Sequence, residues 1–310
     1  MDAALPSPAR EPAVVAGRDL SVTASDGLRL HVRDYGRRTA PFLPVVCLPG
    51  LARTSADFEQ LAAALASHPE RARRVVALDY RGRGRSQYDN NPENYSLAVE
   101  LADVATVLTA LGVGPAVFVG TSRGGILTML MAAAQPTRIA GAVLNDIGPV
   151  LEPQGLMRIK GYVGKLPPPR DIADGAEILK RLFATQFPKL TPDDWLAAAR
   201  LTWSERDGTL VLNYDPQLAR ALDGTDLEKP IPTLWPQFDA LARVPLMLIR
   251  GALTDLLSEA TVQQMRARRR QLEYVEVPDE GHPPRLGTPE MIARIAKFAA
   301  TCDDSRRHAH

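Results

Sequence analysis

The chain has 310 residues, of which 45% are hydrophobic and 24% are charged, a composition that can bury one large domain core. A formal net charge of +1 gives no field that would attract nucleic acid or an anionic membrane, so neither is expected as a partner. Two basic runs, residues 71–74 and 266–270, are interpreted as solvated helix ends or strand edges.

The chain carries no sign of export or membrane insertion. Residues 1–17 contain prolines and acidic side chains without a continuous apolar run, so they are not a signal peptide and are expected to be mobile. No stretch approaches the roughly 20 apolar residues of a membrane span. Cys47 and Cys302 lie far apart in the chain and do not form a disulfide framework, which favours a reducing compartment. We therefore expect a cytoplasmic protein.

Hydrophobic periodicity predicts a regular alternation of strands and helices. Residues 21–36 alternate around Asp26-Gly27, which predicts a β-hairpin. Short apolar runs predict buried strands at residues 44–50, 73–80, 116–122, 139–146, 244–251 and 272–278. Helical segments are predicted at residues 55–67, 96–111, 124–135, 259–269 and 289–300. Apolar strands separated by helices predict a doubly wound, mostly parallel α/β sheet covered on both faces, with an antiparallel hairpin at its leading edge.

The alternation breaks between about residues 148 and 241. This stretch is rich in proline, lacks a clear strand and contains all three tryptophans. Because a loop of this size without secondary structure is uncommon in a compact domain, we predict a mostly helical cap at 148–241. The cap would stand on a core made of residues 18–147 and 242–301. Residues 302–310 are polar and are expected to form a disordered tail.

Ser122 has the local context of a nucleophile. It lies in Gly-Thr-Ser-Arg-Gly, residues 120–124, between a predicted strand and a predicted helix. This strand–turn–helix context is the one that the G-x-S-x-G pattern requires, and flanking glycines relieve crowding in so tight a turn. We therefore predict that Ser122 is a nucleophile rather than an ordinary turn serine.

A serine hydroxyl needs an adjacent base, and the chain has only five histidines. His308 and His310 lie in the polar tail, His31 lies in the leading hairpin, and His68 precedes a proline at a helix end. His282 follows the last apolar strand. Loops at the carboxyl ends of parallel strands converge on one crevice, so His282 is predicted to reach Ser122.

Two aspartates compete to orient the histidine. Asp255 follows the predicted strand at residues 244–251, and Asp146 ends the predicted strand at residues 139–146. Both aspartates occur between the serine and the histidine, so chain order does not separate them. We prefer Asp255, because Asp146 opens the insertion and could instead cap the backbone or anchor the cap.

Backbone N–H groups are expected to stabilise the anionic tetrahedral intermediate. Arg123, directly after the nucleophile, and Leu51, in the loop after the strand at residues 44–50, are predicted to form this oxyanion hole. The side chain of Arg123 either binds an acidic group of the substrate or points to solvent.

The assembled motifs resemble those of the α/β-hydrolase superfamily, from about residue 21 to residue 300. The similar segments are Leu-Pro-Gly-Leu (48–51), Asp-Tyr-Arg-Gly-Arg-Gly-Arg-Ser (79–86), the serine turn (120–124), the loop of Asp255, and Gly281-His282. This resemblance implies an eight-stranded sheet with a helical cap after the sixth strand. Ser122 argues against dehalogenase- and epoxide-hydrolase-like members, which use aspartate at that position. Pro49-Gly50 stands where many relatives have His-Gly, so the subfamily stays open.

We predict a serine hydrolase that cleaves carboxylic esters through an acyl-enzyme intermediate, acting on a small-molecule or a polymeric ester. No metal site is expected, because the sequence contains neither H-E-x-x-H nor paired C-x-x-C motifs. No cofactor is expected, because Gly82 and Gly84 match only half of a dinucleotide fingerprint and Gln87 stands at its third glycine position. Five large side chains of the cap either line an apolar substrate cavity or form the core of the cap itself: Met157, Phe187, Trp195, Trp203 and Trp235.

Other functions remain open at this point. The same three residues serve lactonases, acyltransferases and carbon–carbon-bond hydrolases, since a fold does not determine its chemistry. A cofactor-free oxygenase of this fold would use the serine and histidine for deprotonation. A hydrolase-like ligand receptor would keep the residues without turnover. The oligomeric state is not predicted.

Overall fold

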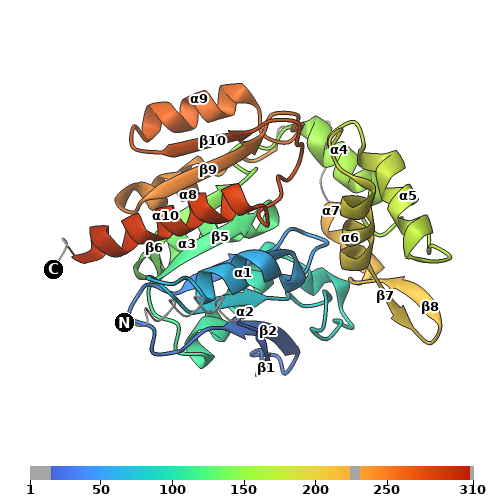
Figure 1. Ribbon diagram of the computed structural model, residues 1–310, viewed down its shortest axis with the longest axis horizontal. Coiled ribbons are helices and arrows are strands. Elements are labelled where there is room, and N and C mark those ends of the chain that lie inside the picture. Colours follow the sequence, from blue (N-terminus) through green and yellow to red (C-terminus); the bar gives the residue numbers. More distant parts are fainter. Residues whose placement is uncertain (1–14, 224–230, 308–310) are drawn as a thin grey trace, which may run out of the picture.

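The computed structural model describes residues 15–223 and 231–307. Its main sheet contains β1 (Arg18–Thr23), β2 (Arg29–Tyr35), β3 (Val45–Leu48), β4 (Val75–Leu78), β5 (Ala116–Thr121), β6 (Ile139–Asn145), β9 (Leu246–Gly251) and β10 (Glu273–Val277). The strand order is β1-β2-β4-β3-β5-β6-β9-β10 (Figure 1). β2 is antiparallel to β1 and β4, and the other neighbouring pairs are parallel. The predicted doubly wound sheet with an antiparallel leading hairpin is confirmed.

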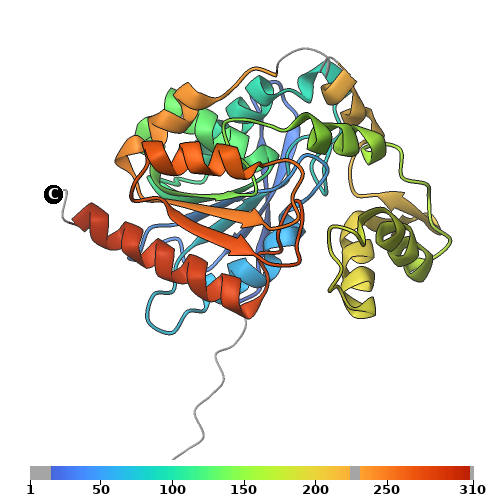
Figure 2. The same ribbon diagram turned by 90° about the horizontal axis from the view of Figure 1, so that it is seen from above.

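Helices cover both faces of this sheet (Figures 1 and 2). One face carries α1 (Glu59–Ala66) and α10 (Pro289–Arg307), and the other carries α2 (Leu97–Ala110), α3 (Arg123–Ala134), α8 (Trp235–Asp239) and α9 (Glu259–Arg268). Successive strand side chains point to opposite faces, so Val45 packs in one layer and Val46 in the other. Every residue of β3, β4, β5 and β9 is buried, which explains their continuous apolar runs.

Between β6 and α8 the chain forms an insertion beyond the carboxyl ends of the parallel strands (Figures 1 and 2). It contains α4 (Pro153–Tyr162), α5 (Ile172–Phe183), α6 (Pro192–Thr202), β7 (Trp203–Arg206), β8 (Thr209–Leu212) and α7 (Arg220–Asp223). Helices α5 and α6 pack on each other around a small apolar core of their own. Side-chain caps define their starts: Asp171 caps α5, and Thr191 with Asp194 forms a capping box on α6.

The antiparallel pair β7–β8 differs from the prediction, which placed no clear strand in the insertion. Asp207 and Gly208 connect the two strands with φ angles of 50° and 75°. Asp-Gly is a favoured pair for a two-residue hairpin turn, because both positions require positive φ. This dipeptide was the available sequence signal for the hairpin.

The predicted end of the cap also differs from the structure. Helix α8 begins at Trp235 and packs against α3 of the core. Trp235 itself packs edge-on against Phe238 and lies under the guanidinium of Arg268, 4.3 Å from the ring centroid. Trp235 therefore belongs to the layer that covers the sheet and not to the insertion.

The C-terminal segment is ordered further than predicted, because α10 continues through Arg307. Cys302 is fully buried, and the carboxylate of Asp303 accepts hydrogen bonds from the Leu43 amide and from Arg73. Cys302 and Asp303 thus pack against the core at the end of α10, whereas residues 1–14 and 308–310 of the two predicted mobile ends lie outside the described residues. Within the described ranges, no helix is both long and apolar enough to cross a membrane.

Candidate active site

Ser122 occupies a strained turn between β5 and α3. Its φ of 51° and ψ of −114° lie outside the ordinary regions for a residue with a side chain. The turn is tight on both sides: a Cβ at Gly124 would lie 2.0 Å from the carbonyl oxygen of Leu48, and one at Gly120 would lie 2.5 Å from the Gly124 backbone. Glycine at these two positions therefore lets the turn press against β3 and present Ser122 at the sheet edge.

His282 lies beside the serine, in the loop that follows β10. Its Nε2 is 2.9 Å from Ser122 Oγ, and its Nδ1 is 2.8 Å from Asp146 Oδ2. Since a carboxylate only accepts hydrogen bonds, the arrangement is satisfied when Nδ1–H donates to Asp146 and the serine hydroxyl donates to Nε2. The structure thus brings together Ser122 and His282, the two residues that the sequence paired.

Asp146, and not Asp255, is the carboxylate beside His282, which corrects our preference. Asp146 is fully buried, has a φ of 53°, and also accepts from the Gly251 amide (3.0 Å) and the Thr254 hydroxyl (2.5 Å). The positive φ turns its side chain from the end of β6 across to the neighbouring β9 loop. The anchoring role that made Asp146 the second choice is present, but its carboxylate reaches His282 as well.

Asp255 has a different partner, Arg158 on α4 of the insertion. The guanidinium donates to both carboxylate oxygens, at 2.7 and 2.8 Å. Burial would raise the pKa of Asp255, but hydrogen bonds and charge from Arg158 outweigh it and lower that pKa. Asp255 therefore ties the insertion to the core instead of orienting the histidine.

The loop of His282 is held on two sides. Asn145 at the end of β6 donates through its side-chain amide to the carbonyl oxygen of Pro284, at 3.0 Å. From the insertion, Gln186 covers Gly281, where an added Cβ would lie 2.5 Å from the Gln186 Cβ. These contacts, one from the core and one from the insertion, restrict the position of the loop that carries the imidazole.

The two predicted oxyanion residues flank the serine. Arg123 is the first residue of α3, and the first N–H groups of a helix have no partner within the helix. Leu51 follows Gly50, and a Cβ at Gly50 would lie 3.9 Å from the Ser122 Cβ, so the β3 loop runs directly past the serine. The backbone at Gly50–Leu51 thus passes beside Ser122, and Arg123 directly follows it in the chain.

The side chain of Arg123 takes neither of its two predicted roles. It donates through Nε to the carboxylate of Glu100 at 2.5 Å and through Nη2 to the carbonyl oxygen of Tyr95 at 3.1 Å. Glu100, on α2, is fully buried and also faces Arg83. Neither Glu100 nor Arg83 was a candidate in the sequence.

The predicted substrate-binding side chains are divided among several environments. Trp195 and Trp203 are buried in the core of the insertion, and Phe187 packs against that core. Met157 on α4 is 55% exposed. Trp235, as described above, lies in the core layer at α8. Their packing favours the interpretation as core for Trp195 and Trp203.

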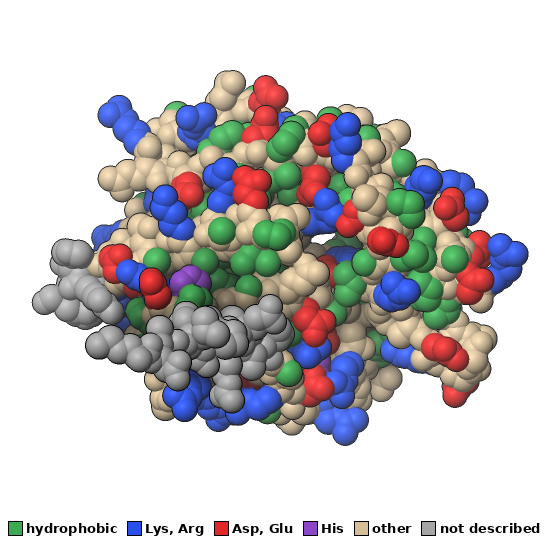
Figure 3. All heavy atoms as spheres, viewed as in Figure 1, with side chains coloured by type: hydrophobic (Ala, Val, Ile, Leu, Met, Phe, Trp, Pro, Cys, Tyr) green, Lys and Arg blue, Asp and Glu red, His purple; other side chains and the backbone are tan. Residues whose placement is uncertain are grey.

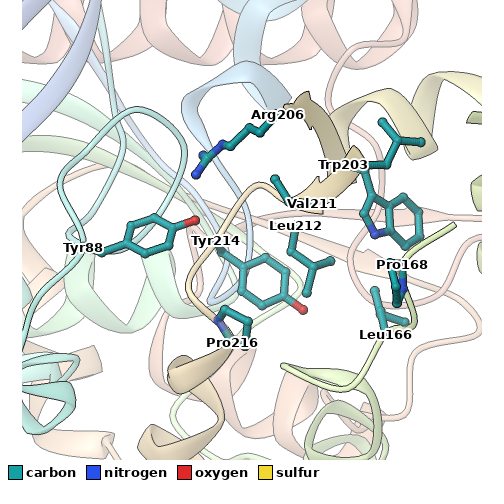
Figure 4. Close-up of a pocket in the computed structure, with 10 residues that line it drawn as sticks. Tyr88, Leu166, Pro168, Trp203, Arg206, Val211, Leu212, Tyr214 and Pro216 are labelled. Carbon is teal, nitrogen blue, oxygen red and sulfur yellow. The ribbon is translucent and has the colours of Figure 1, made fainter. Parts of the chain in front are cut away.

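A pocket of about 370 Å³ lies where the insertion meets the core (Figure 4). Its walls are mostly apolar and come from Tyr88, Leu166, Pro168, Trp203, Arg206, Leu210, Val211, Leu212, Tyr214 and Pro216. The serine, the histidine and Asp146 are not among its lining residues. Figure 3 shows a hollow between the insertion and the sheet-bearing part, and acidic and basic side chains interspersed over this face. In the part of the chain that the structure describes, no cluster of His, Cys, Asp and Glu could hold a metal ion.

The sheet order and the serine turn define the class of this protein, and residues 45–295 match the alpha/beta hydrolase family. The chain belongs to this family of hydrolases. Over 277 residues, 87% of this chain and 92% of the relative, it is 34% identical to a 3-hydroxybutyrate-oligomer hydrolase from Cupriavidus necator.

Two further comparisons cover the chain at similar length. The structure of an alpha/beta hydrolase from Novosphingobium aromaticivorans is similar with a TM-score of 0.85 and 40% identity, covering 92% of this chain and 98% of that chain. A 2-(acetamidomethylene)succinate hydrolase from Mesorhizobium japonicum is 25% identical over 269 residues, which are 86% of this chain and 90% of that protein.

Proposed function

We propose that this protein hydrolyses carboxylic esters through an acyl-enzyme, with Ser122 as nucleophile, His282 as base and Asp146 as the orienting acid. The observation that carries the proposal is the continuous hydrogen-bond chain from Ser122 Oγ through His282 to Asp146, with distances of 2.9 and 2.8 Å. This chain has the contacts of a serine hydrolase triad, in which each group activates the next.

In the first half of the reaction, Ser122 Oγ attacks the ester carbonyl while its proton passes to His282 Nε2. Buried Asp146 stabilises the resulting imidazolium and keeps the Nδ1 proton in place. The protonated histidine then donates to the departing alcohol, which leaves the acyl group on the serine. In the second half, a water oxygen attacks the acyl carbonyl while His282 takes its proton. The protonated histidine then returns that proton to Ser122 Oγ as the carboxylic acid leaves.

The negative charge on the carbonyl oxygen is stabilised by the backbone amides of Leu51 and Arg123. Arg123 lies at the N-terminal end of α3, where the helix dipole adds to the attraction for negative charge. Loss of one such donor typically costs on the order of a hundred- to a thousand-fold in rate. This arrangement is electrostatic and uses no cofactor.

An ester of a short hydroxy acid oligomer is the substrate class that we propose. Similarity to the 3-hydroxybutyrate-oligomer hydrolase extends over nearly the whole length of both chains, and therefore includes the insertion as well as the core. The insertion lies over the carboxyl ends of the strands, where a cap would enclose the units on either side of the scissile ester.

The test compares the wild type with Ser122→Ala and His282→Ala on p-nitrophenyl esters from acetate to decanoate and on the dimer and trimer of 3-hydroxybutyrate. We expect turnover in the wild type that both substitutions abolish, with release of 3-hydroxybutyrate monomer. Full activity of Ser122→Ala would refute the acyl-enzyme. An added alcohol that captures the acyl group would indicate a transferase, and binding of the esters without turnover would indicate a receptor.

A further inference from the structure

A buried cluster of three charges lies directly behind the serine turn. Glu100 and Arg83 are fully buried, and the side chain of Arg123 is only 11% exposed. The Glu100 carboxylate is shared: Oε1 lies 2.8 Å from Arg83 Nη1, and Oε2 accepts from Arg123 Nε at 2.5 Å. One carboxylate therefore connects two guanidinium groups, one from the loop after β4 and one from the start of α3.

Each arginine in turn belongs to or contacts one side of the proposed oxyanion hole. Arg83 Nε donates to the carbonyl oxygen of Leu51 at 2.8 Å. On the other side of the Gly50–Leu51 peptide, the Tyr80 hydroxyl donates to the carbonyl oxygen of Pro49 at 3.1 Å. The peptide that carries the Leu51 N–H thus lies between two anchored carbonyl groups, while Arg123 carries the second N–H itself.

The cluster has a net charge of +1, because a guanidinium does not lose its proton in a protein. Burial would raise the pKa of Glu100, but the charges of Arg83 and Arg123 outweigh burial and lower it, so the carboxylate is ionised. The guanidinium of Arg83 also lies 5.5 and 5.6 Å from the ring centroids of Tyr80 and Tyr95, which offsets part of its lost hydration. Because the cluster is buried, solvent screens the electrostatic effect of this net positive charge only weakly.

We propose that Glu100 is a positioning residue for the oxyanion hole: through Arg83 and Arg123 it fixes the separation of the Leu51 and Arg123 amides. The inference rests on the proposed function of these amides. Without the shared carboxylate, two like charges would face each other and push the β3 loop away from the start of α3. A displacement of about 1 Å is enough to cost on the order of a hundred-fold in rate.

The chain offers a matched control at Asp34 on β2. This carboxylate is also fully buried and is also shared by arginines: it accepts from Arg74 at 2.8 Å and from Arg18 at 3.2 Å. Arg74, like Arg83, donates to a backbone carbonyl, that of Leu111. Asp34 pairs in register with Val76 near the start of β4, away from the carboxyl ends of the strands, so its loss perturbs stability without touching the site.

The experiment measures kcat and KM of the full chain for p-nitrophenyl butyrate in Glu100→Gln, Arg83→Met, Asp34→Asn and the wild type. We expect the first two variants to lose about ten- to a hundred-fold in kcat with KM within about twofold. Asp34→Asn should lower the thermal midpoint yet keep kcat within about twofold. Arg83→Met leaves Glu100 and Arg123 paired, so it tests the proposal even if Glu100→Gln does not fold.

Hydrogen exchange supplies a readout that needs no turnover. We expect the amides of residues 50–53 to exchange faster in Glu100→Gln and Arg83→Met than in the wild type, and at the wild-type rate in Asp34→Asn. If no ester is cleaved by any form, the proposed function fails, while this measurement still decides on the role of Glu100. Unchanged exchange of residues 50–53, or a loss of kcat no larger than in Asp34→Asn, would overturn the inference.

Discussion

Replacing Asp146 by asparagine is expected to abolish most of the activity, and the contacts of the carboxylate show why. Oδ1 accepts from the Gly251 amide, whereas Oδ2 accepts from the Thr254 hydroxyl and from His282 Nδ1–H. If the asparagine keeps its oxygen on Gly251, its NH₂ group faces His282 Nδ1. The imidazole must then accept there, and its proton moves to Nε2, which faces Ser122. The flipped amide would instead place NH₂ against the Gly251 N–H, two donors in contact.

The first orientation removes the acceptor that the serine proton needs, and the second is disfavoured because it places two donors in contact. Loss of the correct tautomer lowers kcat by about 10⁴-fold, or about 5.5 kcal/mol of transition-state stabilisation. Asp255→Asn is the matched comparison, because that residue follows the next strand of the same edge. It removes a partly buried pair with Arg158, whose loss costs on the order of 1 kcal/mol of folding stability. We expect kcat to change by less than about threefold.

The assay is hydrolysis of p-nitrophenyl acetate, whose small acyl group makes few contacts with the insertion. Thermal unfolding of Asp146→Asn and Asp255→Asn checks that both variants are folded at the assay temperature. If Asp255→Asn lost activity by the larger factor while Asp146→Asn retained it, the tautomer argument would be wrong. The acid would then have to reach His282 through a different arrangement of the β9 loop.

Three further substitutions or treatments test the packing of the molecule. Gly124→Ala should prevent formation of the serine turn, because its Cβ would lie 2.0 Å from a backbone oxygen, and near-wild-type activity would contradict this. Burial lowers the pKa of His31, but its contacts with Asp79 outweigh burial and raise that pKa above 6.5. The charged ring therefore stabilises the fold below about pH 6.5, and this stabilisation is lost as the pH rises through the raised pKa. Urea midpoints should therefore fall with rising pH more steeply in the wild type than in His31→Gln, and equal slopes would exclude this role. Cys47 and Cys302 are both buried, and burial raises the pKa of Cys302 to about 12. A thiol reagent should therefore label both cysteines in urea but not in the native protein. Rapid labelling of the native protein would show that the core opens.

The serine and the histidine could be predicted from the sequence because each has a signal that does not depend on detailed geometry. The glycines around Ser122 mark a turn with one backbone solution, and His282 was the one histidine that followed a late strand. The acid had no such signal. Asp146 and Asp255 both follow strands of the same edge, and the choice depends on the positive φ of Asp146, which a sequence pattern does not encode.

Buried charge was the other feature that the sequence concealed. Arg73 and Arg74 were assigned to a solvated basic run, yet both are buried against Asp303 and Asp34. The sequence contains a weak indication that Glu100 is buried, because Glu100 lies four residues before Val104 on the apolar face of the same helix. A charged residue within an apolar stripe needs a partner, but the partners come from distant loops and cannot be named from the helix alone.

Stability alone does not explain the cluster around Glu100. Apolar residues of similar volume often replace a buried ion pair with no loss of stability, because desolvation offsets the attraction between the charges. A cluster with a net charge of +1 is less favourable still for the core, since Glu100 can neutralise only one of its two arginines. A net positive charge is favourable, in contrast, next to a transition state that develops negative charge on one oxygen. Arg83 contacts Leu51 and Arg123 directly follows Ser122, so under the proposed function the cost in stability falls where the positive charge favours the reaction.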